Sequence, residues 1–258
     1  MIEAVILDWA GTTVDFGSMA PVEAFRESFA QYGIEVTNEE IRKPMGMLKI
    51  DHIRTMLNMP RIYDVFCEVY GRAFEEADVQ AIYASFHGHL MQAISAHTKV
   101  KPYVLDAVKE LRDMGVRIGS TTGYTDEMMT VVVEAAKRQG YAPDFWISPD
   151  GVGGSGRPKP YMIFANMQVL GIDHVHKVMK IGDTLSDIAE GKHAGVYTVG
   201  VLEGSSLVGV SETEYKELSD EKRCALLETA REAYFAHGAD EVIMNFKELP
   251  TLVKHLSK

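Results

Sequence analysis

Cysteine, long apolar runs and positive charge are all scarce in this chain of 258 residues. Its 2 cysteines, Cys67 and Cys224, argue against a disulfide scaffold and favour a reducing compartment, so we expect a cytoplasmic protein. No apolar run approaches the ~18 residues of a membrane span, and we expect no signal segment after Met1. The net charge of −11 disfavours nucleic acid and anionic membranes as partners, so an anionic substrate would need locally placed cations.

A carboxylate is also missing where many phosphate-transferring enzymes have one. Residues 2–7, apolar apart from Glu3, form a run typical of a buried parallel strand, which ends at Asp8 and continues as W-A-G-T-T. A strand that delivers a carboxylate to a glycine-containing loop can hold a nucleophile and a metal ion at the edge of a sheet. Such enzymes often place a second aspartate two residues later to protonate an oxygen leaving group, but this chain has Ala10 there. Either the chemistry is lost, or the leaving group is activated in another way.

The segment of residues 19–97 carries helical patterns and no convincing strand. Thr37 and Glu40 have the spacing of a capping box, which predicts the start of a helix. Further helices are predicted over residues 49–58, 63–74 and 78–96. Because this helical block follows a single strand, we expect an inserted all-helical cap domain at 19–97, with 1–18 and 98–258 forming the core domain.

Strands and helices alternate in the rest of the chain. After a helix at 104–114, strands are predicted at 116–120, 145–148, 178–181 and 197–201, with helices at 126–139 and 160–170 between the first three. This alternation predicts an α/β fold with a doubly wound, Rossmann-like parallel sheet. Ligands of such sheets bind at the carboxyl ends of the strands, and Asp8, Thr122 and Asp183 all follow predicted strands. We therefore expect these three residues to meet in one site.

Four short motifs occur in a fixed order along the chain. They are D-W-A-G-T-T-V-D at 8–15, S-T-T-G-Y-T at 120–125, G-R-P-K-P at 156–160 and G-D-T-L-S-D at 182–187. Together they resemble the motifs of the haloacid dehalogenase superfamily, whose phosphotransferases share a doubly wound core. Within it, D-W-A and the cap segment R-K-P-M-G-M-L-K-I-D-H at 42–52 closely resemble the phosphonatase family, whose members hydrolyse phosphonoacetaldehyde.

The resemblance implies that Asp8 is a nucleophile, forming an aspartyl-phosphate that water later hydrolyses. Two anions must meet for this attack, so a hard divalent cation, Mg²⁺, is expected. Its implied ligands are the Asp8 carboxylate, the Ala10 backbone carbonyl and Asp183. Asp187, four residues after Asp183, would bind the metal through water or orient a nearby cation. The alternative for both Asp183 and Asp187 is a helix-capping role.

Two more residues are implied to contact the phosphoryl group. Thr122 would donate its hydroxyl to a phosphoryl oxygen, whereas on its own it would be interpreted as a capping threonine. Arg157 stands where many members of the superfamily carry lysine, and its planar fork would bridge the substrate phosphonate and Asp8. Lys159 is the rival cation, which we interpret as a surface residue.

Lys49 on the predicted cap carries the distinguishing chemistry. Cleavage of a carbon–phosphorus bond leaves a carbanion, and an iminium between a lysine and a neighbouring aldehyde would act as its electron sink. The amine must be partly unprotonated, which requires burial or neighbouring cations, and Met45, Met47 and Ile50 offer apolar surroundings. His52, one helical turn later, could relay protons. The alternative is that Lys49 and His52 are ordinary surface residues.

The resemblance thus implies hydrolysis of phosphonoacetaldehyde to acetaldehyde and phosphate, in the breakdown of 2-aminoethylphosphonate. The cap would close over the core about hinges near residues 16–18 and 97–100. A homodimer paired through the cap is also implied. Two rival functions remain: a phosphomonoester phosphatase that uses water in place of the missing acid, and a non-catalytic binding protein that kept the fold.

Overall fold

The computed structural model describes residues 1–257, and within them six parallel strands form one sheet in the order β3-β2-β1-β4-β5-β6. The strands are β1 (Ala4–Leu7), β2 (Arg117–Thr121), β3 (Phe145–Ile147), β4 (Val178–Gly182), β5 (Tyr197–Val201) and β6 (Glu241–Ile243). The chain proceeds outward from β1 to β3 and then returns to β4 on the other side of β1. The predicted doubly wound sheet is confirmed, and its strand order reverses beside β1, where such sheets bind ligands.

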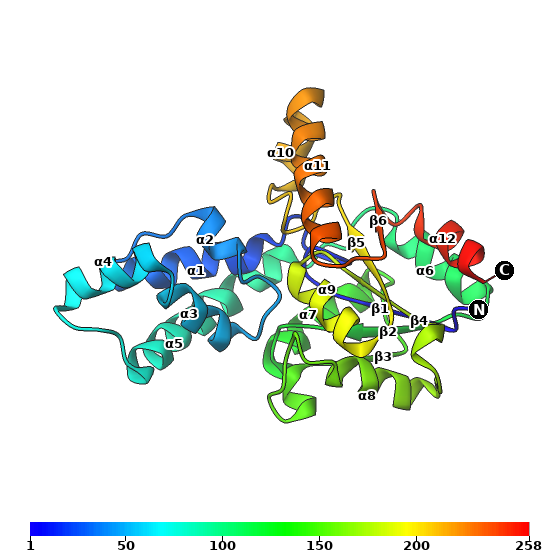
Figure 1. Cartoon of the computed structure of the whole chain (residues 1–258), viewed down its shortest axis with the longest axis horizontal. Helices are drawn as coiled ribbons and strands as arrows, with labels where there is room; N and C mark the ends of the chain where they lie inside the picture. The colour runs from blue at the N-terminus through cyan, green and yellow to red at the C-terminus, as the bar shows by residue number, and fades with distance from the viewer. Residues whose placement is uncertain (258) are drawn as a thin grey trace.

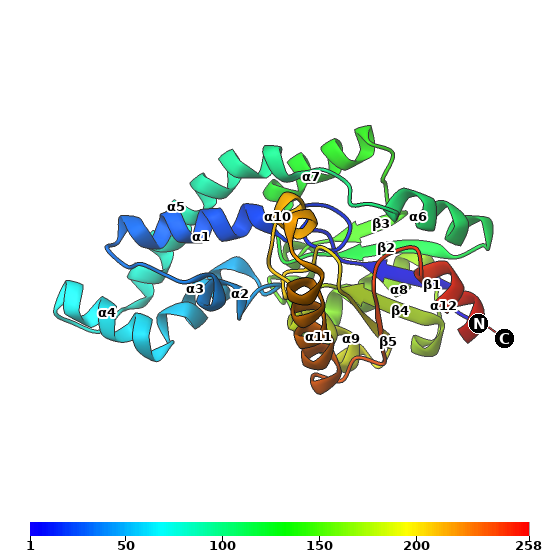
Figure 2. The same cartoon turned by 90° about the horizontal axis from the view of Figure 1, so that it is seen from above.

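Strand β1 lies in the middle of the sheet, between β2 and β4, and both of its faces are covered. Val5 and Leu7 belong to the main hydrophobic core, whereas Ala4 and Ile6 pack into a second core on the opposite face. Figure 2 shows α6 (Val104–Asp113) and α7 (Asp126–Arg138) on one face of the sheet, and α8 (Tyr161–Leu170) and α9 (Leu185–Ala194) on the other. A continuous apolar run is what such a two-sided strand requires.

The remaining helices of the core lie near the last strands and the chain ends. They are α10 (Glu212–Glu217), α11 (Asp220–Ala236) and α12 (Leu249–Leu256), with short turns η2 (Pro149–Val152) and η3 (Val175–Lys177). Helix α11 packs against α9 and β6, and α12 packs against α6. The sequence did not predict β6, which has three residues and no alternating pattern.

A helical lobe extends from one end of the sheet (Figure 1), and we call it the cap. It comprises α1 (Met19–Gln31), α2 (Asn38–Arg42), α3 (Lys49–Leu57), α4 (Pro60–Tyr70), α5 (Glu76–Ala93) and η1 (Ile94–His97). Helix α1 packs along α5, where the rings of Phe25 and Phe86 stack with centroids 4.2 Å apart. The capping box of Thr37 and Glu40 is present at the start of α2.

The two connections between cap and core run side by side. Val14 and Val100 form an antiparallel bridge, the Asp15 N–H donates to the Lys99 carbonyl at 3.1 Å, and the Lys101 N–H donates to the Thr13 carbonyl at 2.9 Å. The cap is therefore joined to the core by a paired two-strand connection. In residues 1–257, no helix is both long enough and apolar enough to cross a membrane.

Candidate active site

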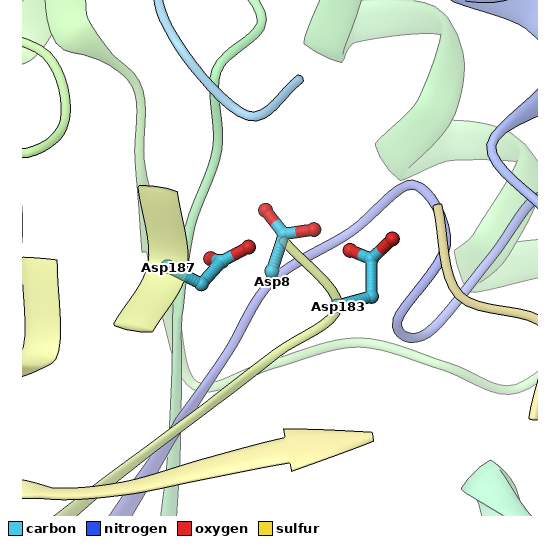
Figure 3. Close-up of side chains that lie close together, drawn as sticks. All are labelled: Asp8, Asp183 and Asp187. Atoms are coloured by element: carbon cyan, nitrogen blue, oxygen red, sulfur yellow. The ribbon is translucent and has the colours of Figure 1, made fainter. Parts of the chain in front are cut away.

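Three buried carboxylates lie together at the carboxyl edge of the sheet. Asp8 follows β1, Asp183 follows β4 and Asp187 lies in the first turn of α9, and one oxygen of each falls within 4.8 Å of the others. In Figure 3 the three side chains stand next to one another, with Asp8 between Asp183 and Asp187. Gly11, at φ +83°, makes this possible, because a Cβ there would overlap the Asp183 carboxylate.

The three carboxylates differ in how much neighbouring positive charge stabilises their ionised forms. Burial raises the pKa of Asp183 to about 7, with the neighbouring Asp8 and Asp187 adding to the effect. Burial and Asp187 also raise the pKa of Asp8. Burial opposes ionisation of Asp187 too, but Arg157 and Lys180 together lower its pKa below the ordinary value. Asp8 and Asp183 are therefore the two carboxylates still short of positive charge.

This donor set suits a hard divalent cation. Carboxylate and carbonyl oxygens are the ligands that Mg²⁺ prefers, and Ala10 lines the same pocket as Asp8. Asp183 is held in place by the Thr12 hydroxyl, which donates to one oxygen at 3.0 Å, and by the Ser206 N–H, which donates to the other at 2.7 Å. Asp187 also forms a capping box with Thr184, so its predicted alternative role is present as well.

Arg157 connects the carboxylates to a deeper ionic network. Its Nη2 lies 2.7 Å from Asp8 Oδ1 and 3.1 Å from Asp187 Oδ1, and its Nε donates to Glu190 Oε2 at 2.9 Å. Its Nη1 is buried and has no hydrogen-bond partner among residues 1–257, which leaves a donor for an anion. Lys159, the rival cation, is exposed as predicted.

Lys180 and Glu190 complete this network, and we did not predict either from the sequence. The Lys180 ammonium, on β4, lies 2.8 Å from Asp187 Oδ1, 2.9 Å from Thr121 Oγ1 and 3.4 Å from Glu190 Oε2. Both side chains are fully buried. A signal did exist: a lysine inside an otherwise apolar strand needs buried partners, and Glu190 stands one helical turn after Asp187.

Thr122 lies in the pocket, and its interpretation as a helix cap is wrong. Its Oγ1 accepts the Tyr124 N–H at 3.0 Å, which leaves the hydroxyl proton available to a ligand. The cap of α7 is instead Thr125, whose hydroxyl accepts the Met128 N–H.

Lys49, the first residue of α3, reaches from the cap into the same pocket. Its side chain is 2% exposed, so its interpretation as a surface lysine is wrong. Its Nζ lies 5.2 Å from the ring centroid of Tyr124 and 5.9 Å from that of Phe25. Burial lowers the pKa of the amine to about 8, although the Asp8 charge acts in the opposite direction. The amine is therefore partly neutral near physiological pH.

His52 is fully buried, so it is not a surface residue either. Its Nε2 lies 2.8 Å from the Ile41 carbonyl oxygen, and its ring centroid lies 3.9 Å from that of Phe25. Burial, aided by Lys49, lowers its pKa well below 6.5, so the imidazole is neutral. Nδ1 has no hydrogen-bond partner in the described chain, and His52 is not among the described residues that line the pocket.

Cap and core together enclose this pocket. Its lining comprises Ser18, Met45, Gly46 and Lys49 from the hinge and cap, and Asp8, Ala10, Thr122, Gly123, Tyr124, Arg157 and Thr184 from the core. The Ser186 hydroxyl donates to the Met45 carbonyl at 3.0 Å, and a Cβ at Gly123 would lie 2.8 Å from the Gly46 carbonyl oxygen. The remaining cavity is about 20 Å³, close to the volume of one water, so the cap is closed in this structure.

A family model described as haloacid dehalogenase-like hydrolase matches residues 2–195. The chain belongs to this family. A phosphonoacetaldehyde hydrolase of Lysinibacillus sphaericus (strain C3-41) is 48% identical, covering 100% of this chain and 96% of that protein. The protein of the same name from Bacillus cereus (strain B4264) is 44% identical, covering 100% and 97%. A crystal structure of a phosphonoacetaldehyde hydrolase-like protein from Oleispira antarctica has a TM-score of 0.95 and 38% identity, covering 99% of this hydrolase and 92% of that chain.

Proposed function

We propose that this hydrolase cleaves the carbon–phosphorus bond of phosphonoacetaldehyde, giving acetaldehyde and phosphate. The observation that carries this proposal is the buried amine of Lys49 in one pocket with the Asp8 carboxylate, beside Ala10 where an acid would otherwise stand. An oxygen leaving group would need that acid, whereas a carbon leaving group needs an electron sink. The names of the two relatives agree with this substrate.

In the first step the neutral amine of Lys49 adds to the aldehyde carbon, one proton is taken up from solvent and one water leaves, giving a protonated Schiff base. The pKa of about 8 keeps a usable fraction of the amine neutral near pH 7. Asp8 then attacks phosphorus, the carbon–phosphorus bond breaks, and its electron pair flows into the iminium to give an enamine. Protonation of the enamine carbon and addition of water release acetaldehyde and restore Lys49.

The second product forms on Asp8. Water attacks phosphorus in the aspartyl-phosphate, the bond to the carboxylate breaks, and phosphate leaves. Arg157 and Thr122 would hold the phosphoryl oxygens, because Arg157 has an unpaired buried Nη1 among residues 1–257 and Thr122 a free hydroxyl proton. The Asp8 carboxylate, the Ala10 carbonyl and Asp183 would hold Mg²⁺, which when bound supplies charge neutralisation as two anions approach.

Asp187 and His52 have supporting roles in this proposal. Asp187 would orient Arg157, with which it pairs at 3.1 Å, and would contact the metal only through water. His52, with a neutral imidazole three residues after Lys49, would relay protons to or from that amine. A water is the alternative proton donor to the enamine.

The test is acetaldehyde release from phosphonoacetaldehyde with Mg²⁺, comparing the unmodified chain with Lys49→Arg. We expect release from the unmodified chain alone, and reduction with borohydride in the presence of substrate should attach a two-carbon group to Lys49, detected by mass. Equal release from both proteins would eliminate the Schiff base. A phosphomonoester phosphatase would instead retain activity on p-nitrophenyl phosphate after Lys49→Arg, and a binding protein would turn over neither compound.

We also propose a homodimer paired through the cap, acting in 2-aminoethylphosphonate breakdown. The exposed side chains of Tyr63, Val69 and Tyr70 on α4 provide apolar surface on the cap that pairing could cover. Light scattering after size exclusion should give twice the chain mass, and Val69→Glu should reduce it to the monomer value. A monomeric unmodified chain would overturn the dimer and leave the chemistry untouched.

A further inference from the structure

Arg42, the last residue of α2, reaches from the cap to the hinge and to a loop of the core. Its Nη1 donates to the Gly17 carbonyl at 2.8 Å and to the Ser206 carbonyl at 3.2 Å. Its Nη2 lies 3.5 Å from Met19 Sδ. One guanidinium thus contacts two separate segments, residues 17–19 and the loop at Ser206, which must be in register when the cap is closed.

The Ser206 segment leads directly to the carboxylate cluster. The carbonyl of Ser206 accepts from Arg42, while the N–H of the same residue donates to Asp183 Oδ2 at 2.7 Å. The loop is also held at the hinge, because the Gly17 N–H donates to the Gly204 carbonyl at 2.8 Å and a Cβ at Gly17 would overlap the Val210 carbonyl. A shift of this loop would therefore move a donor away from Asp183.

We propose that Arg42 is a positioning residue that couples closure of the cap to the orientation of the Asp183 carboxylate. When the cap opens, Arg42 leaves with α2 and the Ser206 carbonyl loses its guanidinium partner. When the cap closes, Arg42 fixes Ser206, and the Ser206 N–H fixes the oxygen of Asp183 that it contacts. Residues that hydrogen-bond to a metal ligand, as Ser206 does to Asp183, fix the orientation of that ligand.

This inference rests on the proposed function only in assigning Asp183 to Mg²⁺, and it can be tested without any substrate. Mg²⁺ binding to the full chain is measured by isothermal titration calorimetry for the unmodified chain, Arg42→Met and Arg42→Lys. Removing a direct hydrogen-bond partner of a metal ligand weakens metal binding about 10–100-fold. Arg42 acts one contact further away, through Ser206, so we expect Arg42→Met to weaken binding about tenfold, the lower end of that range. Arg42→Lys should lie between, because an ammonium can still donate to one of the carbonyls.

The matched control is Arg61→Met. Arg61 is another cap arginine, but it pairs with Glu40 at 2.6 Å and donates to the Glu35 carbonyl at 2.8 Å, both within the cap. We expect its Mg²⁺ affinity to stay within about twofold of the unmodified chain, since the contacts around Asp183 are untouched. Equal losses in Arg42→Met and Arg61→Met would indicate a general disturbance of the cap and overturn the proposal.

Unchanged affinity in a folded Arg42→Met protein, or no Mg²⁺ binding by the unmodified chain, would also overturn it. If Arg42→Met does not fold, the Mg²⁺ affinity of Arg42→Lys is compared with that of the unmodified chain instead. Equal affinities would then reject the coupling. Failure of the proposed function would give a different result. The unmodified chain would then bind Mg²⁺ and Arg42→Met would bind it more weakly, but the unmodified chain would release no acetaldehyde.

Discussion

The Nζ of Lys49, on the cap, lies 5.2 Å from the ring centroid of Tyr124, on the core. The amine is therefore enclosed only when the two parts of the molecule meet. Burial between cap and core keeps water from the amine and lowers its pKa to about 8. In the proposed mechanism, the same contact between cap and core would therefore prepare the amine to react with the aldehyde.

The rate of acetaldehyde release should follow the neutral fraction of Lys49. A lysine with a pKa of about 8 loses neutral amine roughly tenfold per unit below pH 7 and is mostly neutral above pH 8. We therefore expect kcat/KM to rise about tenfold from pH 6 to pH 7 and to level off above pH 8. A pH series with a coupled acetaldehyde assay checks this, with enzyme stability confirmed at each pH. A flat profile between pH 6 and 8 would contradict it.

Mg²⁺ should stabilise the protein more at high than at low pH. The pKa of Asp183 is raised to about 7, so without metal this group binds a proton in the folded state and contributes stability that is lost as pH rises through 7. A proton and Mg²⁺ compete for this carboxylate, and at pH 5.5 the competition should weaken metal affinity about 30-fold relative to pH 8. Thermal unfolding at both pH values, with and without Mg²⁺, measures the difference. Asp183→Asn should reduce the pH dependence of the metal effect to the part that Asp8 contributes. Equal shifts at both pH values in the unmodified chain would reject the assignment.

Removing Lys180 should be far more damaging than removing a lysine at the surface. Lys180→Met leaves Asp187 and Glu190 buried with Arg157 as their remaining close cation, and breaking a buried pair in this way costs about 3–5 kcal/mol of unfolding free energy. Urea denaturation measures the change. Lys177→Met is the control, because Lys177 pairs with Asp173 on the surface and such pairs contribute little. Similar stabilities of the two variants would contradict the structural role of the network.

The positions of Asp8, Thr122 and Asp183 could be predicted because each follows a predicted strand, although the strand before Thr122 is only partly apolar. Apolar runs of this length in alternation with helices imply parallel strands, and parallel pairing alone brings their carboxyl ends to one edge. The cap position of Lys49 was also predictable, from the helical patterns around it. Its burial was not, because burial depends on how the cap meets the core.

Lys180 and Glu190 carried a sequence signal of buried pairing, but their partners lay beyond prediction for a related reason. Their partners, Asp187 and Arg157, become neighbours only when β4, α9 and the loop after η2 pack together, and no local pattern encodes that packing. Arg42 is similar, since its contacts are backbone carbonyls of Gly17 and Ser206, which any residue type would supply. Sequence motifs named the candidate groups for the proposed chemistry, whereas the residues that support these groups could be found only from the structure.

Gly46 should be essential for closure and dispensable for folding. Its φ is +86°, and a Cβ would overlap the Thr184 hydroxyl and lie 3.0 Å from Ser186 Cβ, so Gly46→Ala should keep the cap from seating on the core. Because a misplacement of about 1 Å can cost a hundredfold in rate, we expect kcat/KM to fall about 100-fold. Gly71→Ala is the matched control: Gly71, also in the cap at φ +68°, carries the same backbone strain but has nothing within 4 Å of its Cβ position. Both variants should therefore lose similar, small amounts of thermal stability, and only Gly46→Ala should lose activity. Equal activities in the two variants would show that contact between Gly46 and the core is not needed for catalysis.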